Sequence, residues 1–279
     1  MQLSAPAKIN LSFQIKGRRN DDFHEIETLM VPISLADRLT IETSKNSKAG
    51  IEFSCDNPSL PVGEGNLVVR AAKLFQETTK IATGLKIVLE KKIPHGAGLG
   101  GGSSDAASTL LGLNELFATG LEDHELVGLA AQLGSDVPFF MAGSAAICRG
   151  RGEIVAPTKL SRRLPLLLVK PEFGVPTPWA YGRWKESHEI PGLDYSPQDF
   201  GGVQFGNDLE RPVFERFIFL AHLKMWLRRQ PEVGAALLSG SGSTVFAVLR
   251  EDGDGPQLGT KVRNEIDPSM WTIACETVD

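Results

Sequence analysis

The 279-residue chain is 42% apolar and 23% charged, the composition of a globular protein with a sizeable buried core. Its net charge of −5 argues against a nucleic-acid-binding protein, because phosphate backbones are bound by clustered Lys and Arg, and leaves open only a local basic patch. The first residues lack the basic and apolar regions of a secretory signal, and no apolar run could span a bilayer, so we expect a cytoplasmic protein without membrane contacts. Cys55, Cys148 and Cys275 are scattered, which predicts small buried residues rather than a disulfide framework or zinc site.

The amino-terminal third is predicted to form strands. Apolar residues alternate along residues 7–13, which places Lys8 and Asn10 together on the polar face of a half-buried strand, about 7 Å apart. Because they share a face, both side chains can address one ligand. Further strands are expected at residues 25–33, 38–43 and 50–55, followed by a helix at residues 66–80.

A strand expected at residues 85–92 leads directly into the glycine-rich segment 93–108, IPHGAGLGGGSSDAAS. Ser103, Ser104 and Asp105 can cap the helix that follows, which Gly120 can end. Glycines let backbone N–H groups approach an anion, and a helix N-terminus adds a partial positive charge. The segment is therefore predicted to bind a phosphate; a flexible linker is the weaker alternative.

Three known phosphate loops do not fit this segment. Gly96, Gly98 and Gly101 have the dinucleotide spacing, but the acidic residue about 20 positions on would be Glu115, which lies inside the predicted helix. No Lys follows the last glycine, as a Walker A loop requires. The protein-kinase loop leads into a strand, whereas a helix is expected here.

The remaining elements predict an α+β protein of two domains. A helix is expected at residues 123–133 and a strand at 144–149, before a Pro-rich boundary at 157–165. The second half is predicted to hold strands at 164–169, 235–239, 244–249 and 271–275, with one or two helices within 207–229. The domains are then residues 1–156 and 157–279.

Several motifs together resemble the GHMP small-molecule kinases. Residues 94–107 (PHGAGLGGGSSDAA) resemble their ATP loop, residues 6–11 (PAKINL) their N-terminal motif and residues 133–140 (LGSDVPFF) their catalytic-aspartate segment. Segments at 22–25, 65–68, 175–178, 207–210 and 239–246 follow in the family's order. The resemblance implies a two-domain GHMP kinase fold: an N-terminal mixed α/β domain with the glycine-rich phosphate loop and a C-terminal ferredoxin-like α+β domain.

Within that family, the motifs are most similar to those of kinases that act on a cytidine diphosphate sugar alcohol. This implies transfer of the ATP γ-phosphate to the 2-hydroxyl of 4-diphosphocytidyl-2-C-methyl-D-erythritol, a step of non-mevalonate isoprenoid precursor biosynthesis. Mg²⁺ is expected to arrive with the ATP phosphates rather than in a protein cage. We expect small-molecule partners, and a monomer or homodimer. The alternatives are a kinase with a mevalonate-type or homoserine-type acceptor, a nucleotide-binding regulator without turnover and, more distantly, a nicotinamide-dependent oxidoreductase.

The resemblance also implies roles for individual residues. Asp136 would accept the hydroxyl proton or orient the hydroxyl, and Lys8 would stabilise the transferring phosphoryl group. Without the resemblance, Lys8 would be read as a solvated strand residue and Asp136 as the N-cap of a short turn, a role it can also combine with catalysis.

On the acceptor side, the resemblance implies that Asn10 hydrogen-bonds the substrate, that His24 binds the cytosine and that Phe23 stacks on it. The family more often has Tyr at position 23 and Gly at position 22; Asp22 tolerates left-handed geometry, which would preserve the turn. Thr177 and Pro178 would line the erythritol and diphosphate side.

On the nucleotide side, Asn66 and Lys91 would reach ATP, although a helix cap and a solvated lysine are equally ordinary there. A second glycine-serine turn, residues 239–244, is expected near the active site. No residue is assigned as a metal ligand. The residues expected to hold the ATP phosphates are Pro94, His95, Gly96, Ala97, Gly98, Leu99, Gly100, Gly101, Gly102, Ser103 and Ser104.

Overall fold

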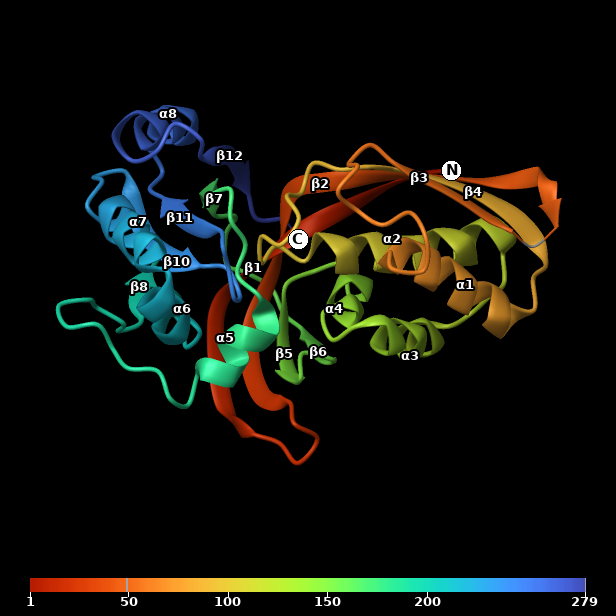
Figure 1. Cartoon of the computed structure of the whole chain (residues 1–279), viewed down its shortest axis with the longest axis horizontal. Coiled ribbons are helices and arrows are strands. Elements are labelled where there is room, and N and C mark those ends of the chain that lie inside the picture. The colour runs from red at the N-terminus through yellow and green to blue at the C-terminus, as the bar shows by residue number, and fades with distance from the viewer. Residues whose placement is uncertain (49, 279) are drawn as a thin grey trace.

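Two β-sheets organise the computed structural model, which describes residues 1–48 and 50–278 (Figure 1). The larger, eight-stranded sheet contains β1 (Gln2–Arg18), β2 (His24–Lys48), β3 (Ile51–Cys55), β4 (Thr83–Glu90), β5 (Ala146–Gly150), β6 (Ile154–Pro157), β8 (Gln198–Phe200) and β9 (Val203–Asn207). The four-stranded sheet contains β7 (Pro165–Lys170), β10 (Val233–Leu238), β11 (Val245–Leu249) and β12 (Trp271–Glu276). The predicted α+β class is confirmed.

The helices cover one side of each sheet, in two lobes that Figure 1 shows side by side. The first group is α1 (Leu67–Thr79), α2 (Gly101–Phe117), α3 (Asp123–Leu133) and α4 (Val137–Met141). The second group is α5 (Thr177–Arg183), α6 (Glu210–Arg216), α7 (Ile218–Arg228) and α8 (Gly255–Glu265). Within the described part of the chain, no helix combines the length and apolar character needed to cross a membrane.

The long β1–β2 hairpin links the two lobes. Two strands were expected at residues 25–33 and 38–43, but β2 is one strand of 25 residues. Ala36 and Asp37 pair with Pro6 and Ala5, and a register shift at residues 33–35 bends the strand without ending it. Register shifts between Pro6 and Lys8, between Asn10 and Ser12 and between Ile15 and Gly17 bend the hairpin. Its turn, residues 19–23, projects at the bottom of Figure 1.

Three apolar clusters form the core. One packs α1 to α4 against the large sheet around Phe75 and Phe139, and another packs α6, α7 and α8 around Phe214. The third lies between the sheets and includes Ile9 of β1 and Phe246 of β11. Apolar residues of β1 therefore pack against the small sheet, which leaves the opposite face of β1 for the site.

Most predicted elements lie within a few residues of the observed ones. The helix expected at 123–133 has those bounds, and the helix expected at 66–80 is α1, with Asn66 as its N-cap. The patterns missed β6, β8, β9 and α8. Because β8 and β9 follow residue 157 but join the large sheet, the division at 156/157 stays a prediction.

The three cysteines were expected to be buried, which the structure confirms for one of them. Cys148 is buried, whereas Cys55 and Cys275 are only partly covered.

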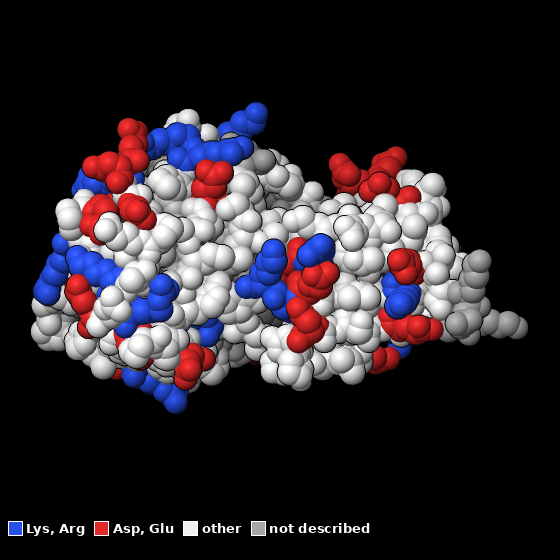
Figure 2. Space-filling model, turned by 90° about the horizontal axis from the view of Figure 1, so that it is seen from above, with Lys and Arg blue, Asp and Glu red and all other residues white. Residues whose placement is uncertain are grey.

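On the face seen in Figure 2, Lys and Arg lie interspersed with Asp and Glu, unlike the continuous basic surface of a nucleic-acid interface.

Candidate active site

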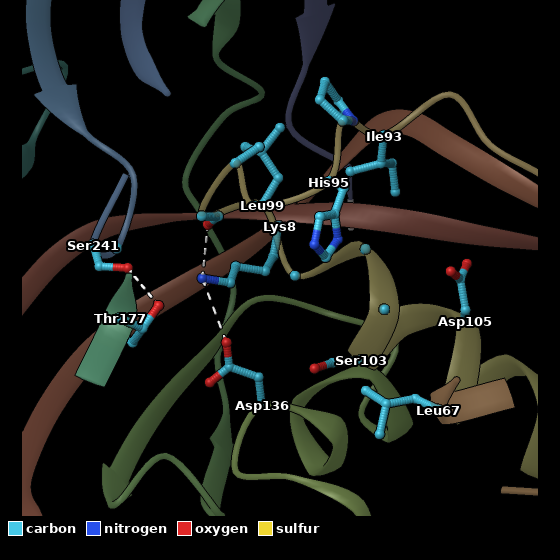
Figure 3. A pocket seen from close by; sticks show the side chains of 18 of the residues that line it. Lys8, Leu67, Ile93, His95, Leu99, Ser103, Asp105, Asp136, Thr177 and Ser241 are labelled. Carbon is cyan, nitrogen blue, oxygen red and sulfur yellow. Dashed lines mark hydrogen bonds and ion pairs between the residues drawn. The ribbon is translucent and has the colours of Figure 1, made fainter. Parts of the chain in front are cut away.

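A cavity of ≈420 Å³ lies where the glycine loop, β1, α4 and α5 converge (Figure 3). Most of the predicted site residues line it: Lys8, Asn10, Asn66, Lys91, Asp136, Thr177 and all of residues 94–103. Ser104, Phe23, His24 and Pro178 lie outside the lining formed by the described residues. The chain thus brings together segments more than 200 residues apart, since Gly240 and Ser241 also contribute.

The glycine loop joins β4 to α2. Its backbone is bonded on both sides, with Lys8 N donating to Leu99 O at 2.9 Å and Thr244 N donating to Ala97 O at 3.2 Å. Gly98 has φ +75°, and a Cβ there would lie 2.1 Å from the carbonyl oxygen of Ser239. A Cβ on Gly100, φ +70°, would lie 2.9 Å from the Lys8 side chain. Only glycine fits this close approach.

Helix α2 begins at the loop itself, with Gly100 as its N-cap. The expectation that Ser103, Ser104 and Asp105 cap the helix is therefore wrong; they lie in its first two turns, because Gly101 and Gly102 are already helical. The positive end of the helix dipole adjoins the cavity, which Ser103 also lines. Ser104 is fully buried, and its hydroxyl finds no hydrogen-bond partner in the described part of the chain.

Lys8 and Asp136 meet at the cavity wall, with Nζ 3.6 Å from Oδ2 (Figure 3). Lys8 is only 4% exposed, so the alternative interpretation of it as a solvated strand residue is wrong: the loop covers that face. Its ammonium donates to Asn10 Oδ1 at 2.8 Å and to Gly98 O at 3.1 Å. Burial with these partners holds the cationic nitrogen at one point.

Asp136 points into the cavity and stays accessible. It occupies the N-cap position of α4, but among the described residues its carboxylate caps no backbone N–H, so the capping role is wrong. Its side chain is 35% exposed, far more than that of Lys8. A partly solvated carboxylate beside a fixed cation is suited to receive or orient a hydroxyl proton.

Asn10 is 1% exposed and engaged at both polar ends, since its Nδ2 donates to Thr28 Oγ1 at 2.8 Å. Thr177 Oγ1 and Ser241 Oγ lie 2.8 Å apart on the opposite wall (Figure 3). The Ser241 contact brings the predicted glycine-serine turn to the cavity.

The start of β2, just past the hairpin turn, lies next to Tyr181, an α5 residue that lines the cavity and that no sequence pattern indicated. Its ring centroid is 5.3 Å from that of His24. Tyr181 follows Thr177 by four positions, the helical spacing that places both on one face. Burial, with a smaller effect from the Asp136 charge, raises the Tyr181 pKa, so the phenol stays neutral.

His24 and Phe23 have different environments. Burial and, less strongly, the Arg18 charge lower the His24 pKa, which favours the neutral imidazole. Phe23 is 49% exposed, with the Arg151 guanidinium 4.6 Å from the centroid of its ring. Asp22 has φ +64°, the left-handed conformation expected at this position.

Lys91 is not the solvated lysine expected as its alternative role. Its ammonium lies between two buried carboxylates, contacting Asp37 Oδ2 and Asp105 Oδ2, the latter at 2.7 Å. Asp37 Oδ1 also accepts from the backbone N–H groups of Lys92 and Ile93, at 2.6 and 2.8 Å. This ion triad (Asp37, Lys91, Asp105) joins the start of the loop to α2. Asn66, in contrast, caps α1 through Val68 N at 2.9 Å.

The triad holds one cation and two acids. Burial raises the pKa of Asp105 to about 7, and the charge of Asp37 adds to that effect while Lys91 opposes it. Asp105 Oδ1 is buried without a hydrogen-bond partner among the described residues.

The described residues also contain no group of three or more His, Cys, Asp and Glu arranged to hold a metal ion.

The fold is that of a GHMP kinase: the family model for the GHMP kinases N terminal domain matches residues 66–144, from the cap of α1 past the end of α4. The chain is 45% identical over 251 residues to 4-diphosphocytidyl-2-C-methyl-D-erythritol kinase of Methylacidiphilum infernorum, covering 89% of this chain and 86% of that one. It is 40% identical over 260 residues to the enzyme of that name from Geobacillus thermodenitrificans, covering 90% of this chain and 89% of that one. The chain belongs to the 4-diphosphocytidyl-2-C-methyl-D-erythritol kinase family.

Solved structures agree with this assignment. A crystal structure of 4-(cytidine 5'-diphospho)-2C-methyl-D-erythritol kinase superposes with a TM-score of 0.80 at 35% identity over the full length of both chains. A homoserine kinase from Cytophaga hutchinsonii, at 17% identity and TM-score 0.69, covers 100% of this chain and 94% of that one. A mevalonate kinase, at 15% identity and TM-score 0.68, covers 99% of this chain and 99% of that one. This chain shares the fold of the homoserine kinase and of the mevalonate kinase.

Proposed function

We propose that the protein transfers the γ-phosphoryl group of ATP to the 2-hydroxyl of 4-diphosphocytidyl-2-C-methyl-D-erythritol, giving ADP and the 2-phosphate, in the cytoplasm. The observation that carries the proposal is the Lys8–Asp136 pair, which lies beside the glycine loop in a cavity bordered by Tyr181 and, behind it, His24. Relatives at 39–45% identity are named for a kinase of this substrate.

The nucleotide occupies the loop side of the cavity in this proposal. Phosphates bind where the loop backbone and the α2 N-terminus meet, because N–H groups and the helix dipole both favour an anion there. Adenosine extends toward Asn66, Leu67 and His95, which line the same cavity. Both acids of the triad engage Lys91, so it acts chiefly by fixing the loop and contacts ATP only at the edge.

The chemistry follows from the two charged side chains. The acceptor oxygen bonds to the γ-phosphorus, the bond from that phosphorus to the β,γ-bridging oxygen breaks, and ADP leaves with the bridging oxygen. Asp136 takes the hydroxyl proton or orients the hydroxyl for in-line attack. Lys8 carries a fixed positive charge that favours alkoxide character and the negative charge on the transferring oxygens.

The donor group facing the phosphates fits a nucleotide-bound Mg²⁺. Ser103 offers a hydroxyl oxygen to the cavity beside the loop, and Mg²⁺ with ATP commonly takes one or two protein oxygens while retaining water. The ion would neutralise phosphate charge.

The acceptor binds on the hairpin side. Tyr181 and Phe23 offer aromatic faces for the cytosine, and a neutral His24 can both donate and accept a hydrogen bond. Thr177 and Ser241 supply hydroxyl groups toward the sugar alcohol and its diphosphate. Pro178, which lies outside the lining, shapes the start of α5.

A product-resolved assay tests the proposal. Purified protein is incubated with ATP, Mg²⁺ and the cytidine diphosphate substrate, and in parallel with mevalonate or homoserine, and products are identified by mass and phosphorus NMR. We expect ADP and the 2-phosphate with the cytidine substrate alone. Product from another acceptor would reassign the substrate, and tight ATP binding without any product would indicate a nucleotide-binding regulator.

A further inference from the structure

Thr28 of β2 lies beneath the catalytic pair, outside the motifs that define the site. It is 0% exposed, and its hydroxyl joins two polar groups: Oγ1 accepts from Asn10 Nδ2 at 2.8 Å and donates to Ser12 O at 2.6 Å. Asn10 in turn holds the Lys8 ammonium. Four residues thus form a continuous buried chain of hydrogen bonds that ends at the nitrogen beside Asp136.

The direction of every bond in this chain is fixed by chemistry. An ammonium can only donate, so the Asn10 atom facing Lys8 is the carbonyl oxygen. The Asn10 amide nitrogen must then face Thr28, whose hydroxyl accepts from it. That hydroxyl therefore gives its own proton to the Ser12 carbonyl, which can only accept.

The backbone is shaped to make this chain possible. Asn10 pairs with Met30, but Ser12 pairs with Leu29, so β1 has one extra residue between them and its register shifts. Such a bulge reorients the groups around it, and bulges are common next to active sites. Here the shift brings the Ser12 carbonyl to the Thr28 hydroxyl.

A fifth residue, in the phosphate loop, also binds the end of this chain. Gly98 O accepts from both Lys8 Nζ, at 3.1 Å, and Ser239 Oγ, at 3.0 Å. Asn10, the loop and Asp136 therefore fix the position of the Lys8 ammonium together. If Asn10 rotated, the ammonium would lose the shortest of its hydrogen bonds.

We propose that Thr28 is a positioning residue for phosphoryl transfer: by fixing the orientation of Asn10, it holds the Lys8 ammonium at the transferring group. The inference rests on the proposed function. It also assigns Asn10 the role of positioning Lys8, in addition to any bond to substrate.

The test compares Thr28→Val, which removes the hydroxyl but keeps the shape, with Thr28→Ser, which keeps the hydroxyl. Thr28→Val leaves a buried Asn10 N–H unpaired, so we expect kcat to fall by about 10- to 100-fold while KM for ATP changes by less than about 2-fold. Thr28→Ser restores kcat to within about 3-fold of wild type. In a Lys8→Met background, Thr28→Val lowers the residual rate by less than about 2-fold, because its effect acts through Lys8.

Thr277→Val is the matched control. Thr277 is also a buried threonine, with 1% exposure, and its hydroxyl accepts from Leu164 N at 2.9 Å, away from the cavity. We expect it to lose stability comparably and keep wild-type kcat. Should Thr28→Val not fold, Thr28→Cys, whose thiol is a weak donor and acceptor, replaces it with an intermediate kcat expected.

The outcomes separate the inference from the proposed function. An active wild type with an unimpaired Thr28→Val, or equal losses in Thr28→Val and Thr28→Ser, overturns the inference alone. An inactive wild type overturns the proposed function; the hydrogen-bond chain is then judged by NMR of the Asn10 side-chain amide. We expect its signals to move and its hydrogen exchange to accelerate in Thr28→Val and not in Thr277→Val, and unchanged signals contradict the chain.

Discussion

At the scale of single residues, the decisive property of the site is the contrast between its two charged groups. Lys8 is buried with all its partners in place, whereas Asp136 is partly open to the cavity. A fixed cation and an accessible base give an acceptor hydroxyl both a charge to stabilise its oxygen and a group to take its proton.

Replacing either residue is expected to abolish most turnover and keep nucleotide binding. For Lys8→Ala and Asp136→Asn we expect kcat to fall by about 10²- to 10⁴-fold, because each removes an interaction made mainly in the transition state. Calorimetric titration should give ATP affinities within about 5-fold of wild type, since the loop backbone remains. Wild-type turnover in either variant contradicts the mechanism.

The sequence predicted which residue types gather at the site, but not their environments. Alternation along β1 placed Lys8 and Asn10 on one face correctly, while the cover over that face comes from a loop about 90 residues later. Tyr181 lacked a signal because a tyrosine on a short helix resembles ordinary packing. The ion pairs of Lys91 had no sequence signal because its partners Asp37 and Asp105 are distant in sequence.

At the scale of elements, the phosphate loop depends on backbone conformations that only glycine adopts easily. For Gly98→Ala we expect loss of ATP binding and of soluble folded protein, because φ is +75° and the new Cβ would collide with the Ser239 carbonyl. Gly128→Ala in α3 is the control: a Cβ there meets no atom within 4 Å, so unfolding should cost about 0.5–1 kcal/mol more. Thermal melts with and without ATP measure both.

The ion triad makes the join between loop and α2 dependent on pH. An Asp has a pKa of about 4 when unfolded, whereas burial raises that of Asp105 to about 7 in the folded chain. The folded state then binds an extra proton between these values, so this stability is full below pH about 4 and is lost as pH rises through about 7.

Asp105→Asn mimics the protonated acid and should remove this dependence. Measured by urea unfolding, the variant is expected to gain about 2 kcal/mol relative to wild type between pH 5 and pH 8. Because both proteins share all other titrating groups, the difference isolates Asp105. A difference that stays constant across this range contradicts the raised pKa.

At the scale of the whole molecule, the cluster between the sheets ties the two halves of the chain together. Ile9 and Val31 come from the first half, Phe205 and Phe246 from the second. The sequence predicted two α+β halves, but it could not show that β8 and β9 return to the large sheet, because three- and five-residue strands carry too little pattern.

Unfolding is therefore expected as one cooperative transition. All four tryptophans, at positions 179, 184, 226 and 271, follow residue 157, so their fluorescence reports the second half. Circular dichroism also reports α1 to α3 of the first half. We expect coincident midpoints by both probes, and Phe205→Ala to lower the free energy of unfolding by about 3–5 kcal/mol. Separated transitions would instead indicate halves that fold independently.

The β1–β2 hairpin carries Lys8 at its centre and His24 just past its turn. Lys8, proposed to assist phosphoryl transfer, and His24, proposed to bind the base, thus lie on one continuous hairpin, and the strand residues between them set their separation. If the two lobes move relative to each other as ligands enter and leave, the separation of Lys8 and His24 along the hairpin stays the same. In the proposed function, one hairpin thus contributes both to the transfer site and to the acceptor site.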